Sequence, residues 1–154
     1  MKRILLPLLA LCLCLTACGG TADEAGYDPA AAAQALLDSG AFTQALDALD
    51  KETACTALYG GLDAETVEDC AVYASLSAGA EEIAVLKLGS AGAAETALTA
   101  LENRVAEQRE ALESYQPEEV GKLDSAIVER KGNTVLLVVA ADAALARSTL
   151  DELN

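Results

Sequence analysis

The sequence predicts a single α+β domain of ββαββα order, in which a four-stranded antiparallel sheet carries two helices on one face, preceded by short N-terminal helices. Three observations support this fold class. The order strand–strand–helix occurs twice between residues 67 and 153. Residues 92–115 have the apolar spacing of a long amphipathic helix. The unbroken apolar run 135–139 is typical of a strand covered on both faces, by its own chain or by an assembly partner.

The N-terminal part of the domain begins with a helix whose two ends are marked. Asp28 is a favourable N-cap, Pro29 suits the first helical turn, and Gly40 follows the Ala-rich segment as a stop signal. Residues 51–59 predict a second, short helix. The intervening residues 42–49 fit a helix and an extended strand equally well, so no element is assigned to them.

The first strand pair lies at residues 67–77 and 82–88. The first of these segments alternates, with Cys70 and Val72 on one face and small or polar residues on the other. The second is short and largely apolar and is followed by Gly89. The two segments predict an antiparallel hairpin.

The second half repeats this order after the long helix. Pro117 ends that helix, and we expect only a short turn before a third strand at residues 124–130. Residues 134–140 predict the fourth strand, and Asp142 caps a last helix over residues 143–153.

The N-terminus carries a signal for export and lipid attachment. Lys2 and Arg3 precede an apolar run, residues 4–15, which is too short to span a bilayer and fits a signal-peptide core. Small residues then precede a cysteine in Leu15-Thr16-Ala17-Cys18, which resembles the bacterial lipobox. We expect cleavage before Cys18 and alkylation of its thiol by a diacylglycerol, whose two acyl chains, such as palmitate, give stable anchoring. The alternative is an ordinary secretory peptide whose cysteine is incidental.

Three segments therefore follow: a removed signal peptide at residues 1–17, lipidated Cys18 with a flexible tether at 18–27, and one α+β domain at 28–154. The mature chain would carry 8 Lys and Arg against 25 Asp and Glu, a formal charge of −17, because only Lys2 and Arg3 are lost with the signal peptide. Such a charge opposes binding to nucleic acid. The expected location is the extracytoplasmic face of the cell membrane.

Composition argues against most enzyme classes. The chain contains no histidine, which is the commonest general base and zinc ligand, and no tryptophan. No phosphate-binding, nucleophile-elbow or calcium-loop motif is present. We expect no catalytic residue, no metal and no cofactor.

Two cysteines remain beside the lipid site. Outside the membrane, Cys55 and Cys70 could form a disulfide that closes a short loop and stabilises the fold by about 3 kcal/mol. Two buried thiols on apolar faces fit the sequence as well.

Polar residues in apolar surroundings mark the candidate sites. Gln108 interrupts the apolar stripe of the long helix, with Arg104 one turn before it and Tyr115 two turns after it. These three residues could line a small polar pocket for an anionic group. The structural interpretation, which we favour, has Gln108 bonded to the backbone near Pro117 and Arg104 paired with an acidic neighbour.

Two carboxylate doublets, Glu81-Glu82 and Glu118-Glu119, could bind a divalent cation or act as acid and base. Adjacent residues of a strand point in opposite directions, so we do not expect the doublets to converge on one site.

Four stretches carry a resemblance to a known family. They are Ala80-Glu81-Glu82-Ile83-Ala84-Val85-Leu86-Lys87, Arg104 with Gln108, residues 115–119, and residues 132–139. In this order and spacing they resemble small Gram-positive bacterial lipoproteins that carry a domain of unknown function. The resemblance implies a cell-surface lipoprotein and implies no activity.

The sequence thus predicts a non-enzymatic binding or interaction module, held at the membrane by its lipid anchor. Its partner could be an envelope protein, a wall component or a small ligand. The alternatives are an envelope enzyme that uses carboxylate chemistry and a weak cation or small-ligand binder.

Overall fold

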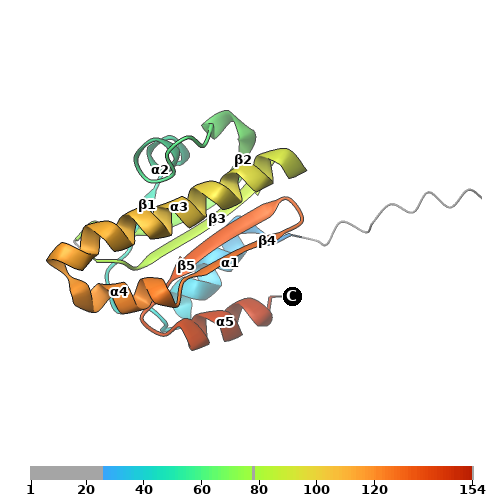
Figure 1. Ribbon diagram of the computed structural model, residues 1–154. Coiled ribbons are helices and arrows are strands. Elements are labelled where there is room, and N and C mark those ends of the chain that lie inside the picture. The colour runs from blue at the N-terminus through green and yellow to red at the C-terminus, as the bar shows by residue number, and fades with distance from the viewer. Residues whose placement is uncertain (1–25, 78, 154) are drawn as a thin grey trace, which may run out of the picture.

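The computed structural model describes residues 26–77 and 79–153, so Leu15, Thr16, Ala17 and Cys18 lie outside the described residues. Within this part of the chain, five strands form one antiparallel sheet in the order β1-β2-β3-β5-β4 (Figure 1). The strands are β1 (Asp47–Leu49), β2 (Val67–Ala74), β3 (Glu82–Leu88), β4 (Ile127–Lys131) and β5 (Thr134–Val139). The α-helices are α1 (Pro29–Asp38), α2 (Lys51–Ala57), α3 (Ala91–Tyr115), α4 (Pro117–Asp124) and α5 (Ala143–Asp151).

The sheet has one more strand than the four that the sequence predicts. β1 is a three-residue edge strand that pairs only with β2, where Asp47 lies opposite Ala74 and Leu49 opposite Val72. It falls within residues 42–49, to which no element could be assigned. Three residues carry too little periodicity to indicate a strand, and the free edge of β2 is what holds them extended.

The expectation of two helices on one face is wrong, because α3 and α5 lie on opposite faces of the sheet. Every residue of β5 is buried, and its side chains alternate between two apolar clusters. Val135, Leu137 and Val139 pack in the cluster that includes α3, whereas Leu136 and Val138 pack in the cluster that includes α1 and α5. A strand that is apolar on both faces needs cover on both faces, and one helix cannot supply it.

The segment after Pro117 also differs from the sequence-based expectation. It forms the eight-residue helix α4, with Pro117 in its first turn, and β4 begins only at Ile127 instead of at residue 124. Gly121 lies within this helix, where its φ is not positive and the space around it is open. Leu123 is buried and Val120 packs against the α3 cluster, so burial of these two side chains stabilises a helix that the glycine alone disfavours.

The sheet has two ends with different contents. One end of the sheet lies beside Gly26, and we call it the entry end. It is formed by Pro29, Val67, Leu88, Lys131 and Thr134. The opposite end, which we call the far end, is formed by Asp38, Ala74, Glu82, Tyr115 and Ile127. Because β2 has eight residues, the two ends are separated by about 26 Å.

Candidate functional site

Most of the buried polar side chains that the structure describes gather at the far end. Four of the five buried polar or charged residues, Glu81, Glu82, Gln108 and Glu119, lie there. With Arg104 and Lys122 they form what we call the far-end cluster. It is built from the loop before β3, the first residue of β3, α3 and α4.

Glu81 precedes β3 by one residue and has no exposed side-chain surface. Its Oε2 atom accepts hydrogen bonds from the backbone N–H groups of Thr43, at 2.8 Å, and Gln44, at 3.0 Å. Its Oε1 atom accepts from the Thr43 hydroxyl at 2.7 Å and from Lys122 Nζ at 2.9 Å. The carboxylate therefore ties the segment before β1 to the start of β3 and to α4.

Glu119 converges on the same ammonium group from α4. Lys122 Nζ lies 2.8 Å and 3.0 Å from the two oxygens of Glu119, one helical turn away. Glu119 Oε2 also accepts from the backbone N–H of Ala80 at 2.9 Å and from Gln44 Nε2 at 3.0 Å. Lys122 is thus shared by two carboxylates that are far apart in the sequence.

The pKa values of these three groups favour their charged forms. Burial by itself raises the pKa of Glu81, but the bonds from Thr43, Gln44 and Lys122 outweigh it and hold this pKa below its ordinary value. Burial likewise opposes ionisation of Glu119, and the bonds from Lys122, Ala80 and Gln44 lower its pKa. For Lys122, burial lowers the pKa, and the two carboxylates raise it by more.

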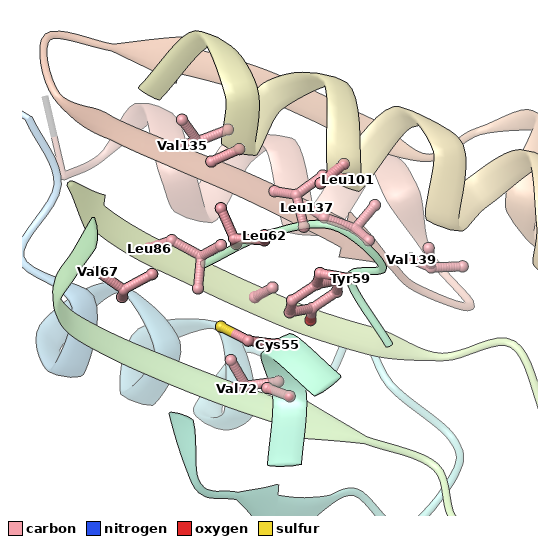
Figure 2. Close-up of a cluster of buried hydrophobic side chains, with 14 of the residues drawn as sticks. Cys55, Tyr59, Leu62, Val67, Val72, Leu86, Leu101, Val135, Leu137 and Val139 are labelled. Carbon is pink, nitrogen blue, oxygen red and sulfur yellow. The ribbon is translucent and has the colours of Figure 1, made fainter. Parts of the chain in front are cut away.

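Glu82 points to the other side of the sheet and belongs to a second buried pair. Arg104 Nε and Nη2 lie 3.0 Å and 2.8 Å from Glu82 Oε2, and the Tyr59 hydroxyl donates to Oε1 at 2.9 Å. The Glu82 side chain has no exposed surface, and that of Arg104 is 19% exposed. Tyr59 is fully buried, and burial together with the Glu82 carboxylate holds its pKa well above the ordinary value (Figure 2). The expectation that Arg104 pairs with an acidic neighbour is confirmed.

Gln108 is buried, but its hydrogen bonds go to the loop before β3 and not to the backbone near Pro117, where they were expected. Its Nε2 donates to the carbonyl oxygens of Gly79 and Ala80 at 3.4 Å and 3.5 Å, which are long hydrogen bonds. Its Oε1 has no hydrogen-bond partner and is the one such buried side-chain atom among the described residues. The side-chain amide of Gln108 on α3 thus binds the loop between β2 and β3 by two weak hydrogen bonds.

The proposed pocket of Arg104, Gln108 and Tyr115 is not formed. Tyr115 is the last residue of α3 and its side chain is 83% exposed, whereas Gln108 is buried and Arg104 is directed to Glu82. The helical spacing that suggested one face holds only to Leu112, where the last buried residue of α3 lies. Beyond this position α3 extends past the core.

The carboxylate doublets behave differently from one another. Glu81 and Glu82 point to different partners, as expected of adjacent residues in an extended segment. However, Glu81 of the first doublet and Glu119 of the second converge on Lys122, which the sequence-based analysis did not foresee. The convergence arises because α4, which the sequence did not indicate, turns Glu119 back toward the start of β3.

Sequence reasoning missed the residues that complete this cluster. Lys122 follows Glu119 at the i, i+3 spacing of a helical ion pair, a signal that could have identified it once α4 was assigned. Tyr59, Thr43 and Gln44 carry no such signal, since only the fold brings them to β3.

Cys55 and Cys70 are free thiols in the structure, Cys55 buried on α2 and Cys70 half-buried on β2. Both contribute to the apolar cluster on the α3 side, where Figure 2 shows Cys55 beside Val72 and Tyr59. Burial raises the pKa of each thiol, so both are poor nucleophiles.

The chemistry open to the far-end cluster is limited by its own bonds. Each carboxylate oxygen of Glu81, Glu82 and Glu119 accepts at least one hydrogen bond from a group fixed by the fold. No group of three or more Cys, Asp or Glu side chains in the described part of the chain could hold a metal ion.

No helix among the described residues is long and apolar enough to cross a membrane.

The protein is a mixed α/β domain. It has an open antiparallel sheet with helices on both faces and a buried ionic cluster at one end, and this architecture by itself indicates no activity. The model of DUF4358, a domain of unknown function, matches residues 39–140, and the chain belongs to this family. The match covers all five strands together with α2, α3 and α4. No curated protein and no solved structure matches the chain.

We expect Gln108→Leu to change the free energy of unfolding by about 1 kcal/mol or less. The substitution removes an unpartnered buried oxygen and two long hydrogen bonds, and these effects oppose each other. Gln108→Glu should instead destabilise the domain by more than about 2 kcal/mol, because it places a charge beside two carbonyl oxygens. Urea unfolding of both variants measures the difference. Equal destabilisation by the two substitutions would contradict this account of Gln108.

Proposed function

We propose that the protein is a non-enzymatic binding module of the cell envelope, held on the extracytoplasmic face of the membrane by lipidated Cys18. One observation carries the non-enzymatic part: the converging carboxylates of the far end are held ionised by donors that also fix the fold. A general acid or base must exchange a proton near neutral pH. The pKa values of Glu81 and Glu119 are shifted in the opposite direction.

The position of the domain relative to the anchor supports a binding role. The nine residues between Cys18 and Asp28 would form a tether with a root-mean-square span of about 15–18 Å. The tether would join the domain at its entry end, so the far end would face away from the membrane. The far end carries two of the exposed large apolar side chains, Leu76 at 67% and Tyr115 at 83%. The ion pairs of the far-end cluster, which lie at the same end of the sheet, would hold this surface in one conformation for a partner.

The anchor is tested by Cys18→Ala. We expect metabolically supplied radiolabelled palmitate to enter the wild-type protein and not this variant, and the variant to be lost from the membrane fraction. Cys55→Ala is the matched control, because it removes a cysteine and should leave both labelling and location unchanged. Label that still enters Cys18→Ala, or wild-type protein that is soluble in the medium, would refute the anchor without affecting the account of the far end.

The non-enzymatic role is tested by comparing stabilities. We expect Glu81→Gln and Glu119→Gln each to lower the free energy of unfolding by about 1–3 kcal/mol, since each weakens charge-assisted hydrogen bonds to groups of the fold. Catalytic carboxylates are commonly replaced without loss of stability, and often with a gain. The exposed Glu118→Gln is the control and should be neutral. An unchanged or raised melting temperature for Glu81→Gln or Glu119→Gln would favour an enzyme that uses carboxylate chemistry.

A further inference from the structure

The entry end contains a cleft that the far-end cluster does not involve. Its volume is about 290 Å³, and it lies between the start of α1 and the adjoining ends of β2, β3 and β5. Its lining consists of residues 26–29, Asp69, Lys87 and Thr134. The cleft is of a size for a small polar molecule of a few heavy atoms and is small for a drug-sized one.

Two opposite charges face this cleft without neutralising each other. Asp69 and Lys87 are register partners on β2 and β3, so their side chains stand on the same face of the sheet, the face that α1 covers. Both are exposed, and neither side chain forms a hydrogen bond or an ion pair with a described residue. The described arginines and Lys122 are paired with carboxylates, whereas Lys87 is not.

The remaining polar groups of the cleft are committed to the fold. One carboxylate oxygen of Asp28 caps α1 by accepting from the N–H of Ala31 at 2.8 Å. The Thr134 hydroxyl donates to the carbonyl oxygen of Tyr27 at 3.3 Å. Gly26 and Thr134 pack closely against each other on one side of the cleft, since a Cβ atom at Gly26 would lie 2.3 Å from the Thr134 hydroxyl oxygen. The cleft is therefore preformed, with one ammonium and one carboxylate available to a ligand.

We propose that this cleft binds a small zwitterion, which carries a primary ammonium and an anionic phosphate or carboxylate group a few bonds apart. The ligand's anionic group pairs with Lys87, and its ammonium pairs with Asp69. A simple anion is repelled by the two carboxylates that line the cleft, and a simple cation leaves the Lys87 ammonium without a partner. Both halves of a zwitterion are matched.

Two sources can supply this chemistry: a free zwitterion, such as an amino acid, and the phosphoethanolamine head group of a phospholipid. If the anchor of the proposed function holds, the entry end lies within a tether length of the membrane surface, which makes the head group accessible. Binding of a free zwitterion requires no anchor. The proposal can therefore fail or succeed independently of the proposed function.

The first test uses the full mature protein in detergent micelles, followed by amide chemical shifts during titration. Phosphoethanolamine is the probe, and glycine, ethanolamine and inorganic phosphate are the comparison compounds. We expect saturable shifts confined to the cleft for the two zwitterions, with affinities at least about tenfold higher than for ethanolamine or phosphate. Equal affinity for inorganic phosphate alone, or no saturable shift with either zwitterion, would overturn the proposal.

The second test uses variants and lipid. Asp69→Asn and Lys87→Ala should each raise the Kd for phosphoethanolamine by about tenfold or more, since each removes one charge-assisted contact. Glu65→Gln and Lys51→Ala, which alter charges outside the cleft, should leave it unchanged. Micelles that contain phosphatidylethanolamine should compete with the free probe if the head group is the ligand, and should not if the ligand is a free zwitterion. Unchanged binding in both cleft variants would refute the site.

Discussion

Arg104→Ala should destabilise the domain by about 3 kcal/mol. The substitution leaves the Glu82 carboxylate, which has no exposed surface, with only the hydroxyl of Tyr59 as a partner. A buried charge without its counter-ion retains the cost of desolvation and loses the compensating attraction. In a domain of this size the melting temperature should fall by roughly 10 °C, which thermal unfolding measures.

The same helix offers a matched control. Arg109 pairs with Asp124 at the surface, where both side chains are substantially exposed. Arg109→Ala should therefore cost less than about 1 kcal/mol. A double variant, Glu82→Leu with Arg104→Leu, should recover much of the loss, because it removes both charges and leaves apolar volume in their place. Equal effects of Arg104→Ala and Arg109→Ala would show that the Glu82 pair contributes no more than a surface ion pair.

Lys122→Met should destabilise the domain by about 2–3 kcal/mol near pH 7, and the loss should shrink in acid. The substitution leaves Glu81 and Glu119 close together without their shared cation. Glu81 retains three donors from Thr43 and Gln44, so the loss is smaller than for a carboxylate with no other partner.

The direction of the pH dependence follows from the pKa shifts. The folded-state pKa values of Glu81 and Glu119 lie below the ordinary 4.5, so their contribution is complete above about pH 5 and is lost as the pH falls through the folded values. The pKa of Lys122 is raised above 10.5, so its contribution is complete below that pH and is lost as the pH rises through the folded value. The difference between wild type and Lys122→Met should thus be largest between about pH 5 and 10.

Urea unfolding at about pH 3, 5 and 7 measures this difference. Lys51→Met is the control, since Lys51 donates only to the carbonyl oxygen of Val67 and should show a small, pH-independent effect. A loss in Lys122→Met that is the same at pH 3 and pH 7 would contradict the assignment of its cause to the two carboxylates.

These ionic pairs connect the segments that carried the family resemblance. Residues 80–87, Arg104 with Gln108, and residues 115–119 come from separate parts of the chain. In the structure Ala80 bonds to Glu119, Glu82 to Arg104, and Gln108 to the loop before β3. The resemblance therefore rests largely on residues that join β3, α3 and α4. This explains how it can identify a family without indicating an activity.

The sequence by itself determined the elements whose signals are local. An N-cap aspartate or serine begins α1, α2, α3 and α5, and each accepts a hydrogen bond from the first turn of its helix. The bounds of β3 were predicted as the structure has them, and those of β2, α3 and β5 within three residues. Capping and apolar periodicity act over one or two turns, so they can be recognised without knowledge of the fold.

Only the tertiary structure decided the partners. β1 is held extended by the edge of β2, and α4 is stabilised by burial of Leu123 against the α3 cluster. α5 lies opposite α3 because the even-numbered residues of β5 also need cover. Glu81 and Glu119 converge on Lys122, and Tyr59 and Arg104 converge on Glu82. The bonded residues are 3 to 41 positions apart in the sequence. Such pairs form where packing has already excluded water, so their energies depend on a core that no local stretch of sequence describes.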